Sequence, residues 1–114
     1  MTRISYNNRR FRAVQNSETG EIGGDTVFHY HQTGNIVWAQ YSGGEIVRGH
    51  LIAFCDDEGK LDMRYHHINL RSEIMTGTCR STPEVLAAGR IRLHEKWQWT
   101  SGDLSTGESV LEEF

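Results

Sequence analysis

Residues 90–101 read RIRLHEKWQWTS, and this alternating stretch decides the fold. One set of alternate positions carries Ile91, Leu93, Glu95, Trp97 and Trp99. A repeat of two residues predicts a β-strand with one buried face and one solvated face. The buried face then holds two tryptophans and a carboxylate, and a bare carboxylate is costly to bury. We therefore expect Glu95 to be hydrogen-bonded, paired with a cation, or protonated.

Seven further segments have the period or the β-branched and aromatic content of strands, with glycine-containing turns between most of them. They cover about residues 9–16, 25–32, 35–42, 45–55, 60–68, 73–81 and 107–113. Only residues 83–88, PEVLAA, have helical character, with Thr82 as a cap and Pro83 at the first position. The sequence thus predicts an all-β fold, a single antiparallel up-and-down meander of about eight strands that closes into a small barrel.

Counting residue pairs outward from the turns predicts which side chains point into the barrel. A two-residue turn at Gly43-Gly44 puts Tyr41 opposite Ile46. The count carried through the later turns puts Thr76 and Arg80 on inner faces. The other predicted interior side chains are Phe28, Tyr30, Val37, Tyr41, Ile52, Phe54, Leu61, Met63, Tyr65 and Ile74.

Length and charge limit the classes of function. The chain has 114 residues, the size of one domain, and its formal net charge is −3. A nucleic-acid partner calls for a clustered basic surface, which this composition does not indicate. The stretch MTRISYNNRR lacks the apolar core of a signal peptide, and no stretch reaches the length of a membrane span. We therefore expect a cytoplasmic protein with no membrane partner, in which Cys55 and Cys79 stay reduced.

Three segments carry a resemblance to a known family, and they read YHQTGNIVWAQYSGG (residues 30–44), HINLRSEIMTG (67–77) and RIRLHEKWQWTSGD (90–103). From about Asn7 to the end, the chain resembles a family of short bacterial proteins of unestablished role, some of which are called N-acetylglutamate synthase. An acetyltransferase of that kind needs a glycine-rich βα turn for the acetyl-CoA pyrophosphate, and this sequence has no such turn. In plan the chain is similar to the avidin and lipocalin barrels, which hold small molecules in the barrel mouth. The resemblance implies a ligand-binding barrel.

The predicted inner faces carry a set of ligand-binding candidates. The polar candidates are Tyr30, Tyr65, His67, Thr76, Arg80 and Glu95, and the candidates for flat apolar walls are Trp97 and Trp99. Arg80 and Glu95 are also candidates for a buried ion pair. The alternative interpretation is a barrel filled by packed aromatic side chains, in which His67 is a buried, hydrogen-bonded residue. The sequence leaves these two interpretations open.

Histidines suggest a metal site only weakly. His29 and His31 share a strand face roughly 6.5–7 Å apart, a spacing that one metal ion can bridge. A closed site needs further ligands, for which His66 and His94 are candidates, but no sequence spacing requires them to come near. An exposed polar face is the favoured interpretation, so we expect no metal and no cofactor.

Three functional hypotheses follow. The first is a non-enzymatic protein that binds one small organic ligand between aromatic walls and a few polar anchors. The second is a small-barrel enzyme that uses Glu95 with His67 or His94 as acid and base. The third is a self-associating structural protein, a homo-oligomer whose barrel is full.

Overall fold

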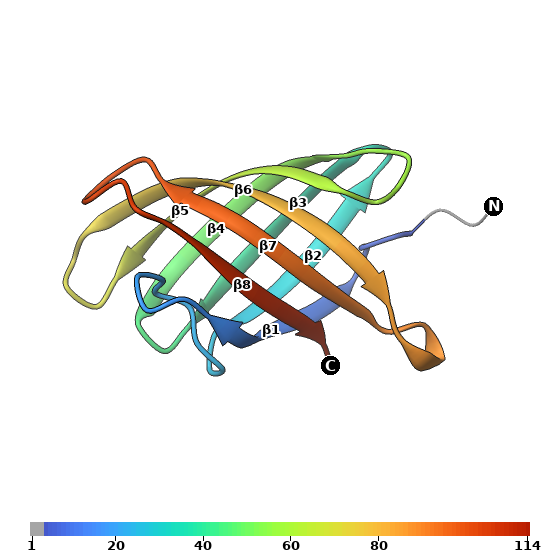
Figure 1. The fold of residues 1–114 in the computed structure, drawn as a ribbon, viewed down its shortest axis with the longest axis horizontal. Helices are drawn as coiled ribbons and strands as arrows, with labels where there is room; N and C mark the ends of the chain where they lie inside the picture. The colour runs from blue at the N-terminus through green and yellow to red at the C-terminus, as the bar shows by residue number, and fades with distance from the viewer. Residues whose placement is uncertain (1–3) are drawn as a thin grey trace.

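The structure, a computed structural model, describes residues 4–114. Its strands are β1 (Arg9–Asn16), β2 (Val27–Thr33), β3 (Ile36–Gly43), β4 (Ile46–Cys55), β5 (Leu61–Asn69), β6 (Ile74–Val85), β7 (Ile91–Trp99) and β8 (Thr106–Glu113). Each strand pairs antiparallel with the next, and β8 pairs with β1 to close a barrel (Figure 1). Residues 1–3, the start of the MTRISYNNRR stretch, lie outside the described residues. The prediction of an all-β up-and-down barrel is confirmed.

The period of two in residues 90–101 has the expected result. Along β7, Ile91, Leu93, Glu95, Trp97 and Trp99 are all buried, and the residues between them are half-buried or exposed. Closure of the sheet leaves no open edge strand, so the backbone hydrogen-bonding groups of β1 and β8 are used within the barrel. The face of β7 that carries these five buried side chains points into the barrel, as its pattern predicts.

The predicted register between β3 and β4 is wrong. Gly43, and not Tyr41, lies opposite Ile46, and Tyr41 lies opposite Gly49. Register irregularities in β3 and at the start of β4 insert residues that a regular two-residue turn does not have. Because such a shift turns the later side chains of β4 to the other face, Ile52 and Phe54 point outward and are largely exposed.

A second register error, of one residue, affects β6. The Asn69 side chain accepts hydrogen bonds from the backbone N–H groups of Arg71 and Glu73, and the pairing restarts with Ile74 opposite Ile68. Ile74 therefore points outward, and Thr76 and Arg80 on the same strand point outward with it. The other predicted interior side chains are buried, except that Tyr65 is half-buried; they are Phe28, Tyr30, Val37, Tyr41, Leu61 and Met63.

The short helix predicted at residues 83–88 is also wrong. Strand β6 continues to Val85, with Pro83 opposite Leu93 on β7. Only a 3₁₀ turn, η1 (Ala87–Gly89), follows, and the Leu86 N–H donates to the Arg90 carbonyl oxygen to close the hairpin. Two neighbouring strands that stay paired this far leave only a tight turn for the connection.

One end of the barrel is filled by aromatic side chains. Tyr6 lies in the segment before β1, and its ring packs against Phe11 and Tyr30, with ring centroids 6.5 and 6.0 Å away. The Tyr6 hydroxyl donates to the carbonyl oxygen of Gly59 in the β4–β5 turn. The three rings are fully buried, so this end of the barrel, where the β4–β5 turn lies in Figure 1, is closed.

The opposite half of the barrel has a different kind of wall, in which aromatic rings lie over glycines of the neighbouring strand. The directly paired residues are Tyr41 with Gly49, Tyr65 with Gly77, and Trp97 with Gly107. A Cβ atom added at any of these glycines would lie 2.3–2.4 Å from the opposing ring. The missing side chain is therefore what lets each ring lie along the wall.

This arrangement makes a prediction for Gly107→Ala. The added methyl group would have to displace the Trp97 ring, so the free energy of unfolding should fall by about 1–3 kcal/mol. Gly23→Ala is the matched control, because a Cβ there has no heavy atom within 4 Å and should change stability by less than about 0.5 kcal/mol. Urea unfolding of both variants measures the difference. Equal stabilities would contradict the role of the Trp97–Gly107 pair.

Candidate functional site

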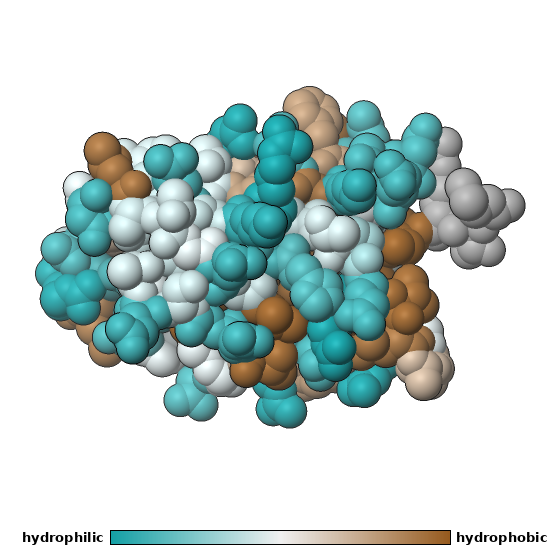
Figure 2. Space-filling view, in the orientation of Figure 1, coloured by the Kyte–Doolittle hydropathy of each residue, from teal (hydrophilic) through white to brown (hydrophobic). Residues whose placement is uncertain are grey.

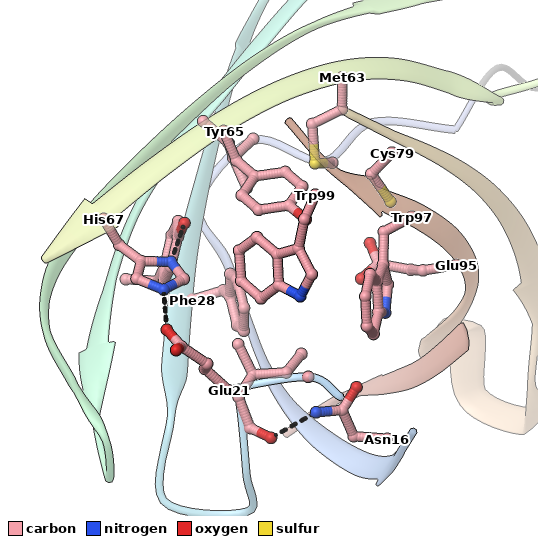
Figure 3. A pocket seen from close by; sticks show the side chains of 14 residues that line it. Asn16, Glu21, Phe28, Met63, Tyr65, His67, Cys79, Glu95, Trp97 and Trp99 are labelled. Atoms are coloured by element: carbon pink, nitrogen blue, oxygen red, sulfur yellow. Dashed lines mark hydrogen bonds and ion pairs between the residues drawn. The ribbon is translucent and has the colours of Figure 1, made fainter. Parts of the chain in front are cut away.

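A cavity opens at the end of the barrel opposite Tyr6 (Figure 3). Its lining residues are Asn16, Gly20, Glu21, Ile22, Phe28, Tyr41, Leu51, Met63, Tyr65, His67, Cys79, Glu95, Trp97 and Trp99. The space between them is about 440 Å³, including the open mouth. The cavity is therefore narrow, and its size suits a compact molecule.

Two tryptophans form one wall of the cavity. The ring centroids of Trp97 and Trp99 lie 5.6 Å apart, and Tyr65 packs edge-on to Trp99 at 5.7 Å. The indole N–H of Trp97 donates to the Ser109 hydroxyl, and that of Trp99 donates to the Thr19 carbonyl oxygen. Because both N–H groups are used by the protein, the rings offer the cavity apolar surface and π faces.

Glu95 projects into the same wall beside Trp97, and only 7 % of its surface is exposed. The Ser81 hydroxyl donates to its Oε2 atom at 2.6 Å. Burial raises the pKa of Glu95 to about 7, and the hydrogen bond from Ser81 only partly offsets that rise. The expectation that Glu95 is buried with a specific partner is confirmed, and that partner is a neutral hydroxyl.

His67 stands near the mouth and is 3 % exposed. Its Nε2 atom lies 2.7 Å from Glu21 Oε1, and its Nδ1 atom lies 3.0 Å from the Tyr41 hydroxyl. Burial lowers the pKa of His67, although the hydrogen bond to Glu21 opposes the change. A neutral ring fits both partners, with the Nε2 proton donated to the carboxylate and Nδ1 accepting from the tyrosine. His67 is thus the buried, hydrogen-bonded histidine of the alternative interpretation, and it also lines the cavity.

Glu21 is the functional candidate that the sequence reasoning missed. It lies in the loop between β1 and β2, and its side chain is only 9 % exposed. Its second carboxylate oxygen accepts hydrogen bonds from Asn69 and from Arg71, the latter at 2.7 Å. The Asn16 side chain donates to the Ile22 carbonyl oxygen and holds the loop over the mouth. A single carboxylate in a glycine-rich loop has no periodic neighbours, so no sequence pattern marks it as buried.

The structure brings together five of the eight predicted ligand-binding residues, which are Tyr65, His67, Glu95, Trp97 and Trp99. Tyr30 lies in the aromatic cluster near Tyr6 and does not line the cavity. Thr76 is on the outer wall, where its hydroxyl lies 2.7 Å from that of Thr100. Arg80 is exposed opposite Lys96, so its predicted inner position and its pairing with Glu95 are wrong.

The remaining histidines with predicted roles lie on the outer surface. His29 and His31 are neighbours with ring centroids 4.5 Å apart, but each ring has another hydrogen-bond partner, Asn8 and Gln40 respectively. Residues 4–114 contain no cluster of three or more side chains arranged to hold a metal ion. His94 is on the exposed face of β7, opposite to the face that carries Glu95, and its ring lies 2.8 Å from Glu84.

Comparison with known proteins gives one match. A family model described as avidin-like protein matches residues 4–114. Neither the curated proteins nor the solved structures gave a match to the chain. In the part of the chain that the structure describes, no helix has the length and apolar character needed to cross a membrane.

The burial of Glu95 makes a prediction about pH. Because its pKa is about 7 in the folded chain and about 4.5 in the unfolded chain, the folded form holds a proton that the unfolded form releases between those values. The resulting stabilisation is complete below about pH 4.5 and is lost as the pH rises through 7. Each pKa unit is worth about 1.4 kcal/mol, so the parent should lose about 3 kcal/mol relative to Glu95→Gln over this range. Urea unfolding across pH measures it, and a constant difference would contradict the burial of an unpaired carboxyl.

Proposed function

The chain belongs to the avidin-like protein family, and we propose that it is a non-enzymatic protein that binds one compact organic ligand in the open end of its barrel. Avidin-like barrels typically bind small ligands. The observation that carries the proposal is the contrast between the two ends, one filled by the rings of Tyr6, Phe11 and Tyr30 and the other left as a cavity between aromatic walls. Pockets of this composition, mostly apolar with a few placed polar groups, are typical ligand sites.

The hydrogen bonds of His67 favour binding over catalysis. An acid–base enzyme would use Glu95 with His67, the histidine that lines the same cavity. Both ring nitrogens of His67 already have protein partners, Tyr41 and Glu21, so neither is available to take a proton from a ligand. We propose a small organic molecule as the partner, and neither a nucleic acid nor a membrane. The proposed location is the cytoplasm.

Met63 provides a direct test, because its side chain lines the cavity and Met75 on the next strand does not. With methionine methyl groups labelled with ¹³C, we expect some compact compounds in a library of amines, acids and neutral molecules to shift the Met63 signal and leave Met75 nearly unchanged. Leu51→Phe, which adds a ring at the cavity wall, should abolish the shift, whereas Val47→Phe on the exposed face of the same strand should not. A library in which no compound selectively shifts Met63 would contradict the proposed function.

A second candidate function, self-association, is supported by an exposed apolar group on the outer wall. Ile36 lies opposite Phe54 and Trp38 lies opposite Ile52, and all four side chains are more than one-third exposed. We call these four residues the outer patch. By contrast, Figure 2 shows that the face carrying β7 and β8 is mostly hydrophilic, with its hydrophobic residues in separate groups.

The charges beside the outer patch favour a second copy of this chain as its partner. Asp62 pairs with Phe54 and Arg64 with Ile52 across β4 and β5, and the two charges lie side by side at 2.9 Å. In a symmetric dimer whose apolar side chains meet at the centre, Asp62 and Arg64 of each copy would lie at the rim of the interface. An apolar centre with a polar rim is the usual anatomy of a protein interface.

Ile52→Lys combined with Phe54→Lys should therefore shift the chain from dimer to monomer, because charges would be buried at the apolar centre. Light scattering after size-exclusion chromatography measures the mass. Val47→Lys is the control, since Val47 is an equally exposed apolar residue of β4 outside the patch. A parent chain that is monomeric at every accessible concentration would contradict the self-association proposal.

A further inference from the structure

The charges that line the cavity are all acidic. Glu21 stands at the mouth and Glu95 lies in the wall, and none of the other lining residues is a lysine or an arginine. The two carboxylates differ in one respect. Glu21 is paired with the Arg71 guanidinium at 2.7 Å, whereas the only hydrogen bond that Glu95 receives from a side chain of residues 4–114 comes from the neutral Ser81 hydroxyl. Within the described residues, Glu95 is thus a buried acid with no cationic side chain beside it.

The space beside Glu95 is enclosed by aromatic rings. Figure 3 shows its carboxylate next to Trp97, on the side toward Trp99. The indole N–H groups of both tryptophans donate into the protein, to Ser109 and Thr19, so they are not available to an anion. What the rings offer is their electron-rich faces, which attract cations.

We propose that the ligand is a compact organic cation, whose ammonium group is held by the Glu95 carboxylate and the faces of Trp97 and Trp99. This inference rests on the proposed function, because it names the class of ligand that the same cavity takes. An anionic ligand would meet the Glu95 carboxylate, and the lining offers it no lysine or arginine. A neutral ligand would leave ionised Glu95 without a counter-charge.

Protonation of Glu95 should compete with the ligand. Among residues 4–114, the other titratable groups that lie close enough to interact with its charge are Tyr6, Tyr30, Tyr41, Tyr65 and Cys79. Burial raises the pKa of each of them, so all five stay neutral around pH 7. His67 at the mouth has a lowered pKa and is neutral there as well. Glu95 is therefore the wall group whose charge changes near neutral pH, and a cation of fixed charge should bind in exchange for its proton.

The experiment compares two probes of the same shape, choline and 3,3-dimethyl-1-butanol, in which a neutral carbon replaces the charged nitrogen. Titrations followed by the Met63 methyl signal give both affinities at pH 8, 7, 6 and 5. We expect choline to bind at least tenfold more tightly than the alcohol at pH 8. Between pH 7 and pH 5 the affinity for choline should fall roughly tenfold per pH unit, as the exchange of one proton requires, and the affinity for the alcohol should not fall.

Two variants connect the charge preference to Glu95. Glu95→Gln keeps the shape and the acceptor for Ser81, so it should still bind the alcohol and lose the preference for choline. Glu108→Gln is the matched control, an exposed glutamate on β8 that does not line the cavity, and it should behave like the parent. The pH dependence of the parent chain is an independent readout that needs no variant to fold.

The outcomes separate this inference from the function on which it rests. Equal or tighter binding of the alcohol to the parent at pH 8 overturns the cation proposal and supports a ligand-binding cavity. A choline preference that survives in Glu95→Gln overturns the assignment to Glu95. If neither probe shifts Met63, the cation proposal fails. The proposed function then fails only if the wider library of acids and neutral molecules also leaves Met63 unchanged.

Discussion

Aromatic rings lie over glycines at three places on the inner wall, and this packing keeps one half of the barrel hollow. A small eight-stranded barrel is just wide enough for its own side chains to fill it. Tyr41, Tyr65 and Trp97 would occupy much of that width if each pointed straight at the barrel axis. Because the residue opposite each one is a glycine, the ring instead covers the neighbouring strand and leaves space beside it. The closed half has no such pairs around Tyr6, Phe11 and Tyr30, and their rings pack against one another.

The period of two in β7 was enough to predict its own faces but not those of distant strands. The burial of Glu95 could be predicted because the inference uses only Leu93 and Trp97 on the same strand. Predictions for Thr76 and Arg80 had to pass through several turns, and a single shift at the Asn69 turn reversed both. The strand ranges could be predicted because glycine-containing turns mark where most strands end. The faces could not, because irregularities within the strands have no clear sequence signal.

The sequence predicted the cavity side chains that lie on strands, but it did not predict the partners of the polar ones. Tyr65, His67, Trp97 and Trp99 follow the alternation of their strands, so the sequence places them inside. Their polar partners do not belong to that alternation. Glu21 comes from a loop more than forty residues before His67, and their contact exists only once the barrel has closed. No local pattern could have assigned the tautomer of His67 or the partner of Glu95, because both depend on residues of other strands.

Glu21 is paired with a cation and Glu95 is bonded to a neutral hydroxyl. This difference determines where the cavity can discriminate between charged and neutral ligands. At the mouth, Arg71 already balances Glu21, so a cation that enters there meets a compensated charge. Deeper in the wall, no lysine or arginine of the described part of the chain lies beside Glu95, and the raised pKa of Glu95 means that its ionisation makes the folded chain less stable. A cation bound at Glu95 would remove that penalty, which a neutral molecule of the same shape cannot do. The attraction therefore acts only on a ligand that has left water and entered the aromatic wall, where a charge interaction is strongest.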